Sequence, residues 1–164
     1  MPQAAGDIPG ETGTRQPSLD VGALYHEQWA RLVRLAFLLV GSRETAEDLV
    51  AGAFLRLEVR PGPPAEPVAY LKRMVVNAAR DHHRHAAVAR RAPLAPATVT
   101  GIPEIDETWE ALGRLPERQR QALVLRYYAD CTLHQVAELL GCPLGTAKSL
   151  IHRGLAALKG ELLS

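Results

Sequence analysis

Apolar residues recur at helical spacing in two blocks of this sequence, and proline-rich stretches interrupt them. Residues 92–103, APLAPATVTGIP, hold three prolines, one glycine and no charge, which is typical of a linker that is neither helix nor strand. Residues 60–67, RPGPPAEP, hold four prolines and one glycine, so no helix can continue through them. Alternation of period two never extends beyond a few residues. The sequence therefore predicts an all-α protein with two small domains, at 21–91 and 104–164.

The first block is expected to contain three helices. Gly41 supplies a left-handed stop for the first helix, and Ser42 is placed to cap the second. The third helix is expected from about Val68 to about Arg90, after the proline-rich loop. The apolar positions of the first two helices each lie on one face: Trp29, Leu32, Val33, Ala36, Phe37 and Val40, then Ala46, Leu49, Val50, Ala53, Phe54 and Leu57.

The second block ends in a predicted helix-turn-helix. Thr132 caps a short helix that reaches Leu140, Gly141 supplies a tight turn, and Pro143 suits the first position of the next helix. The buried face expected for that helix consists of Ala147, Ile151, Gly154, Leu155 and Leu158. The outer face is then expected to hold Thr146, Ser149, Leu150 and Arg153, flanked by Lys148 and His152.

These outer side chains suit DNA, since Lys and Arg bind phosphates or guanine, and Ser and Thr bind either. The second helix of a helix-turn-helix enters the major groove. The alternative to DNA binding is an ordinary helical hairpin whose polar face only contacts solvent. Pattern alone leaves both interpretations open.

Four motifs make the second block more specific than a lone helix-turn-helix. They are LPERQR at 115–120, LRYY at 125–128, VAELLG at 136–141 and GTAKS at 145–149. Together they resemble region 4 of bacterial sigma factors, more narrowly of the extracytoplasmic-function (group 4) sigma factors. The resemblance implies contact with the −35 promoter element through Thr146, Lys148, Ser149, His152 and Arg153. The family usually carries Arg where this chain has Leu150.

The first block is similar to sigma region 2, over residues 24–57. Its Ala46 to Phe54 stretch matches the helix that such factors lay on the clamp helices of the RNA polymerase β′ subunit. The resemblance implies polymerase binding by Glu47, Asp48, Leu49 and Phe54. An acidic edge beside an apolar stripe suits such a partner, although core packing with a solvated acidic face has the same spacing. Family members usually carry Gln, then Glu or Asp, at positions 51 and 52, where this chain has Ala and Gly.

The third expected helix concentrates positive charge. Between residues 70 and 91 there are six basic residues against one acidic residue, whereas the whole chain has a net charge of +1. Such a stripe is an electrostatic footprint for nucleic acid, or else a solvated basic face. The resemblance places it where sigma factors hold the −10 element. It assigns the DNA-facing positions to Asn77, Arg80, Asp81 and Arg84, and base capture to the loop at 60–67.

Other classes of protein find little support in the sequence. The only metal-like cluster, Asp81 with His82, His83 and His85, has no second group of ligands, so no metal, cofactor or catalytic residue is predicted. Cys131 and Cys142 form no CxxC motif and suit a helix end and a turn. The longest apolar run is far short of the ~20 residues of a membrane helix. Residues 1–20 are expected to be a disordered leader, since they lack the apolar core of a signal peptide. We therefore expect a cytoplasmic protein.

The favoured interpretation is an alternative sigma factor that directs RNA polymerase to specific promoters and helps to open DNA. Its partners would be core RNA polymerase, promoter DNA and an anti-sigma factor. The alternative is a helix-turn-helix regulator that has lost polymerase binding, which the Ala51-Gly52 pair would explain. A metal-dependent enzyme built around His82 to His85 is the least favoured class.

Overall fold

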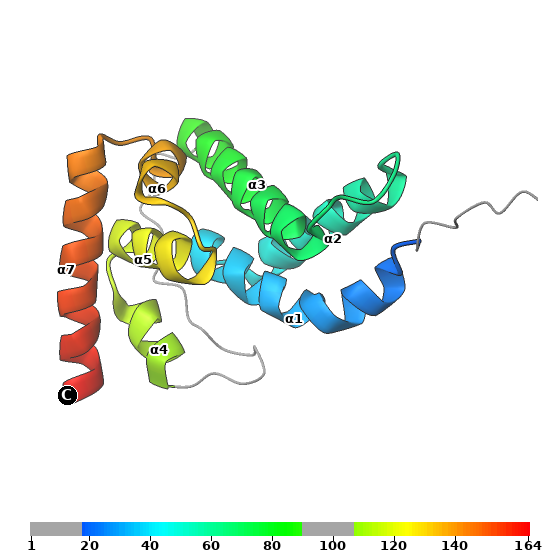
Figure 1. Cartoon of the computed structure of the whole chain (residues 1–164). Helices are drawn as coiled ribbons and strands as arrows, with labels where there is room; N and C mark the ends of the chain where they lie inside the picture. The colour runs from blue at the N-terminus through cyan, green and yellow to red at the C-terminus, as the bar shows by residue number, and fades with distance from the viewer. Residues whose placement is uncertain (1–17, 90–106) are drawn as a thin grey trace, which may run out of the picture.

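The computed structural model describes residues 18–89 and 107–164, so the predicted linker and nearly all of the predicted leader lie outside the described residues. The described residues contain seven α-helices, one short π-helical segment and no strand, which confirms the all-α prediction (Figure 1). The elements are α1 (Val21–Val40), α2 (Arg43–Val59), α3 (Pro67–Ala89), α4 (Glu107–Arg114), α5 (Glu117–Leu123), η1 (Val124–Tyr128), α6 (Leu133–Leu140) and α7 (Leu144–Leu163). No described helix has the length and apolar character needed to cross a membrane.

The predicted helix boundaries follow from local capping. Gly41 has φ 75°, and its N–H donates to the carbonyl of Phe37. The Ser42 hydroxyl accepts from the backbone N–H of Thr45 at 3.3 Å, as a cap of α2 should. Thr132 caps α6 in a reciprocal box with the Gln135 side chain. These stops and starts are confirmed.

Two boundaries differ from the prediction. Pro143 is the N-cap of α7 rather than its first helical residue, because its ψ of 153° keeps it extended and α7 begins at Leu144. The single helix expected around Ala122–Tyr128 is instead α5 followed by the π-helical η1. A π-turn adds one residue per turn and changes the direction of the following side chains.

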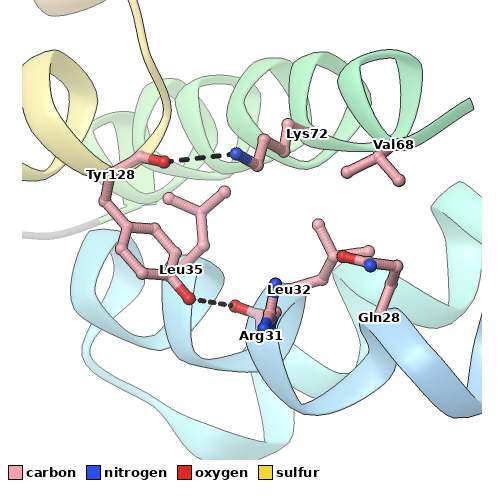
Figure 2. Close-up of a pocket in the computed structure, with 7 residues that line it drawn as sticks. All are labelled: Gln28, Arg31, Leu32, Leu35, Val68, Lys72 and Tyr128. Atoms are coloured by element: carbon pink, nitrogen blue, oxygen red, sulfur yellow. Dashed lines mark hydrogen bonds between the residues drawn. The ribbon is translucent and has the colours of Figure 1, made fainter. Parts of the chain in front are cut away.

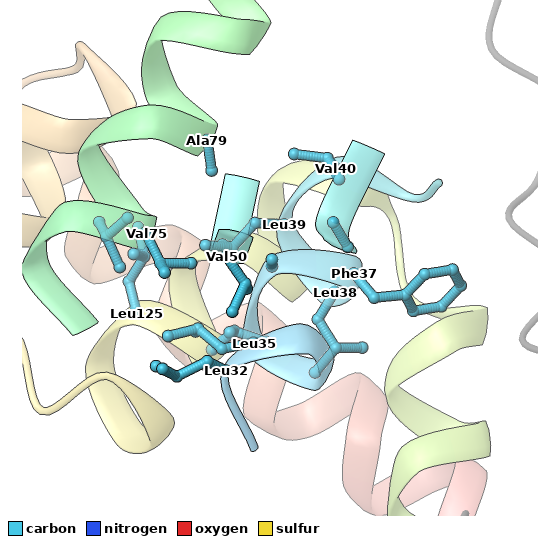
Figure 3. Packing of buried hydrophobic residues seen from close by; sticks show 14 of the residues in the cluster. Leu32, Leu35, Phe37, Leu38, Leu39, Val40, Val50, Val75, Ala79 and Leu125 are labelled. Atoms are coloured by element: carbon cyan, nitrogen blue, oxygen red, sulfur yellow. The ribbon is translucent and has the colours of Figure 1, made fainter. Parts of the chain in front are cut away.

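Helices α1, α2 and α3 pack against one another, and α4 to α7 form a second group in which α7 stands against α4, α5 and α6 (Figure 1). Phe54 of α2 is 5% exposed and contacts the rings of Tyr25 and Trp29. One cluster of buried apolar side chains runs through both groups. Figure 3 shows Leu125 of η1 lying beside the core side chains Leu35 and Val75 of the first group. The two halves of the chain therefore share an apolar core.

Gly52 is a helical glycine on the surface of α2, and a Cβ built there meets no atom within 4 Å. We expect Gly52→Ala to raise the free energy of unfolding by about 0.5–1 kcal/mol, since glycine costs that much in a helix interior. Urea denaturation followed by circular dichroism measures the change.

Gly154→Ala is the contrasting variant for this measurement. A Cβ at Gly154 lies 3.0 Å from Leu123 Cγ and 3.3 Å from the backbone oxygen of Gln119, at the contact of α7 with α5. Crowding there offsets the gain in helix propensity. An equal rise in stability for both variants would contradict this assignment of the two glycines.

Candidate DNA and polymerase interfaces

The predicted recognition helix is α7, and its outer face carries the five side chains assigned to DNA. All five are exposed: Thr146, Lys148, Ser149, His152 and Arg153. The opposite face is anchored by Ala147, which is fully buried against the rest of the domain. Arg153 Nε donates to the Ser149 carbonyl at 3.3 Å, one turn back along the helix. The helix thus presents a polar and basic surface with hydrogen-bond donors that are open to solvent.

Leu150 was expected on this outer face, and that prediction is wrong. Leu150 is only 7% exposed, while Leu155, expected in the core, is 42% exposed. Leu150 lies three residues after Ala147 and four before Gly154, so helical geometry places all three on one side. Leu150 therefore belongs to the domain core. An uncharged residue at this position does not lower the charge of the outer, DNA-facing surface of the helix.

The basic helix α3 carries a polar and basic stripe that is largely exposed. Asn77, Asp81 and Arg84 are exposed, and Arg80 is half-buried with its Nε 3.8 Å from the Asp81 carboxylate. Arg73 is also exposed and stands four residues before Asn77, on the same side of the helix. The stripe therefore contains one residue that the assignment by resemblance omitted. The spacing i, i+4, i+7 and i+11, starting from Arg73, could have revealed it.

Lys72 does not belong to this stripe. Its Nζ lies 3.3 Å from the Asp130 carboxylate and 3.5 Å from the Tyr128 carbonyl, both in the C-terminal half of the chain. One of the six basic residues counted in the sequence is therefore engaged within the protein. Arg90 and Arg91, two more of the six, lie outside the described residues.

The four residues assigned to polymerase binding on α2 have different surroundings. Asp48 is exposed, Glu47 pairs with Arg43 at 3.0 Å, and Leu49 is half-buried. Phe54 lies in the aromatic core described above. Only the first three thus present atoms at the surface of α2.

Two further apolar side chains extend this surface of α2. Leu55 is 63% exposed and Val59 is 80% exposed. They follow Asp48 by seven and eleven residues, so all three lie on one side of the helix. The sequence pattern alone does not identify them as surface residues, because Leu and Val are normally assigned to a core. An exposed apolar pair beside a carboxylate is a fitting surface for a protein partner.

One histidine of α3, His83, makes contacts with distant parts of the chain. His83 Nε2 lies 2.6 Å from the Leu39 carbonyl and 3.1 Å from Gln121 Nε2. Among the described residues, no group of three or more His, Cys, Asp or Glu side chains could hold a metal ion. His83 thus has a structural contact with the end of α1.

Both cysteines are free. Cys142 lies in the turn before α7, as predicted, whereas Cys131 lies in the loop between η1 and α6 rather than at a helix end. Burial, helped by the charge of Asp130, raises the pKa of the Cys131 thiol. A thiol with a raised pKa is mainly protonated at neutral pH and is a poor nucleophile. This environment is that of a structural cysteine.

An apolar groove of about 300 Å³ lies between the two halves of the chain. Leu38 of α1 forms part of its wall, and Trp109, Leu112, Tyr127, Leu155 and Leu158 form most of the rest. Tyr127 is 58% exposed. The groove offers contiguous apolar surface without a buried charge.

Comparison with known proteins matches both halves to one family. The family model described as Sigma-70 region 2 matches residues 24–88, and that described as Sigma-70, region 4 matches residues 105–158. The chain is 31% identical over 146 residues to the RNA polymerase sigma-E factor of Streptomyces avermitilis, covering 81% of this chain and 79% of that protein. It is also 31% identical over 153 residues to the ECF RNA polymerase sigma factor SigL of Mycobacterium tuberculosis, covering 84% of this chain and 85% of SigL.

A solved structure has a similar fold. It is the sigma factor RpoE of Bartonella quintana in complex with the anti-sigma factor NepR, with a TM-score of 0.52 and 21% identity. The match covers 85% of this chain and 96% of that one. Because the region 2 and region 4 models both match, the comparisons favour a sigma factor over a helix-turn-helix regulator that has lost polymerase binding and over a metal enzyme. This protein belongs to the extracytoplasmic-function sigma factors of the sigma-70 family, non-enzymatic factors that direct RNA polymerase to specific promoters to initiate transcription.

Proposed function

We propose that three helices of this sigma factor each bind a different part of the transcription complex. Helix α2 docks on the β′ clamp helices of core RNA polymerase through Glu47, Asp48 and Leu49, with Leu55 and Val59 extending the contact and Phe54 supporting it from the core. Helix α3 holds the −10 element. Helix α7 reads the −35 element through Thr146, Lys148, Ser149, His152 and Arg153. In this division residues 21–91 and 104–164 are the two functional domains, and 92–103 is the linker.

The observation that carries the proposal is the exposed stripe on α3. Arg73, Asn77, Arg80 and Arg84 share one side of the helix, while Leu71 and Val75 on the other side are fully buried. A chain with a net charge of +1 has thus placed cations along one solvent-facing edge. Such an edge favours the phosphates of nucleic acid over an uncharged partner.

An anti-sigma factor is the further partner that we propose. The apolar groove lined by Trp109, Tyr127 and Leu155 provides a surface for a partner helix, because amphipathic helices bury their apolar face in such grooves. The similar RpoE structure was solved with an anti-sigma factor bound, which supports this choice of partner. The site of action would be the cytoplasm, where polymerase and promoter DNA are found.

The contribution of α3 is tested with the double variant Arg80→Ala, Arg84→Ala. We expect binding of the holoenzyme to a pre-melted −10 fragment to weaken. The slope of log K against log salt should become shallower by about 0.7–0.9 for each phosphate that is no longer neutralised. The measurement is a fluorescence anisotropy titration at several salt concentrations.

Arg56→Ala is the matched control for this titration, since Arg56 is exposed on α2 outside the stripe. It should leave the slope unchanged. A double variant that keeps the original slope would show that the stripe on α3 is merely solvated.

A further inference from the structure

The C-terminal end of α6 leads directly into α7, and an arginine from α5 completes it. An α-helix leaves its last four carbonyls without partners inside the helix. Gly141, at φ 60°, donates its N–H to the Glu138 carbonyl at 3.1 Å, so the backbone of the turn satisfies part of this end. The Leu140 carbonyl instead accepts from Arg118 Nη2 at 3.0 Å. A side chain from 22 residues earlier in the chain thus holds the turn of the helix-turn-helix.

The segment that enters α6 is held in a similar way. Arg126 Nη1 of η1 donates to the Cys131 carbonyl at 3.0 Å, immediately before the cap of α6. At the start of the same loop, Figure 2 shows Lys72 Nζ of α3 directed at the Tyr128 carbonyl. Arg126 and Arg118 belong to the same half of the chain as α6, whereas Lys72 does not. The two arginines therefore hold the two ends of α6 from within its own half.

The position of α6 determines that of α7, because the two helices are closely joined. Only residues 141–143 separate them. Val136 of α6 and Ala147 of α7 are both fully buried in the same apolar cluster. Hydrogen bonds to a base edge need donor–acceptor distances of about 2.7–3.2 Å. A small displacement of α6 would therefore move the outer side chains of α7, such as Arg153, out of reach of the bases.

The surroundings of Arg118 and Arg126 favour contacts within the domain. Both are exposed, and exposed arginines of a DNA-binding domain are commonly assigned to phosphates. Here, however, a backbone carbonyl engages one donor of each. A cation at the carbonyl end of a helix is favoured by the helix dipole, and a charged donor strengthens the hydrogen bond. The Arg126 guanidinium also lies 5.9 Å from the centre of the Tyr127 ring.

We propose that Arg118 and Arg126 are positioning residues for recognition of the −35 element. They hold the ends of α6, and through the turn they determine where the α7 side chains meet the base edges, without contacting the bases themselves. This inference rests on the proposed function, since it requires α7 to read DNA. A residue that acts by position changes the preference among sequences, whereas a phosphate contact changes the affinity for all sequences alike.

Gel-shift titrations of the holoenzyme on promoters that differ in one base pair of the −35 element test the proposal. Arg118→Ala should weaken binding to the preferred element about tenfold and reduce the preference over the changed element at least threefold. Arg126→Ala should show the same pattern. Equal losses on both elements, with a salt slope shallower by about 0.9, would reveal a phosphate contact and overturn the proposal. Binding equal to that of the wild type would overturn it as well.

Arg114→Ala is the matched control for these titrations. Arg114 is an exposed arginine of the same half, and its ion pairs among the described residues are with Glu110 and Glu161, away from the ends of α6. This variant should keep both the affinity and the preference of the wild type. Circular dichroism at rising temperature should show that all the variants remain folded at the temperature of the titrations.

A double variant tests whether Arg118 acts through α7. In the Arg153→Ala background, Arg118→Ala should have little further effect on the preference at the base that Arg153 reads, because the side chain that it positions is missing. Two residues that act independently would instead give additive losses. An undiminished effect of Arg118→Ala in that background would contradict the positioning role.

Amide hydrogen exchange of the free full chain, followed by NMR, tests the hold on α6 without DNA. The N–H groups of Gly141 and Cys142 are hydrogen-bonded in the turn. They should exchange at least threefold faster in Arg118→Ala than in the wild type or Arg114→Ala, and unchanged exchange would overturn the proposal. A wild-type holoenzyme without any preference among −35 elements would overturn the proposed function of α7. The exchange rates would still decide whether Arg118 holds the turn.

Discussion

Asp48→Ala is expected to weaken association with core RNA polymerase by about 2–5 kcal/mol, which is roughly 30-fold or more. Asp48 is exposed on α2, in line with Leu55 and Val59. At a protein interface, removing one member of a charged pair leaves the other buried without a partner, and that penalty dominates the loss. The measurement is a binding titration of fluorescently labelled chain with core polymerase at matched salt.

Glu138→Ala is the matched control for Asp48→Ala, because it removes an exposed acid from α6 in the other half of the chain. Circular dichroism should show intact helices in both variants, since neither carboxylate is buried. Asp48→Asn should retain part of the affinity by keeping the size and some hydrogen bonding of the side chain. Equal affinities for Asp48→Ala and Glu138→Ala would remove Asp48 from the polymerase-binding surface.

Arg153→Ala is expected to weaken −35 recognition by about 1–3 kcal/mol if the guanidinium makes a bidentate contact with guanine. The loss should depend on the sequence of the element, because only a base contact discriminates among bases. Lys148→Ala should weaken binding to all elements alike and lower the salt dependence, as a phosphate contact does. Gel-shift titrations of the holoenzyme on promoters with single-base changes measure both effects.

Arg114→Ala again provides the control, since Arg114 is exposed on α4 rather than on the outer face of α7. It should leave both the affinity and the preference among elements unchanged. Unchanged affinity and salt slope for both Arg153→Ala and Lys148→Ala would show that α7 does not read DNA through its outer face.

The local signals in the sequence predicted most of the fold. Ser42 and Thr132 start helices because each hydroxyl accepts a backbone N–H three residues later, and Gly41 ends one because glycine readily adopts positive φ. These interactions involve residues within one helical turn, so they can be predicted from a few neighbouring residues in the sequence. The π-helical turn at Val124–Tyr128 has no such signal, since its residues are also ordinary helix formers.

The candidate interfaces were predictable to the extent that helical spacing defines a face. Thr146 and Arg153 are exposed as predicted, because a helix anchored at Ala147 must present the opposite side to solvent. Spacing failed for Leu150 and Leu155, which lie near the edge of the buried arc. At such an edge a side chain is covered or exposed according to the neighbouring helix, and periodicity does not contain that information.

The sequence by itself determined the helices, their caps, the break between two blocks and the motifs of the sigma family, because each depends on residues close together along the chain. Only the tertiary structure decided that Lys72 faces Asp130 while Arg73 faces solvent, and that Arg120 caps the end of α1. Arg120 and Leu38 are 82 residues apart. Contacts at such separation depend on how whole helices pack, and packing is determined jointly by all the apolar faces rather than by any short pattern.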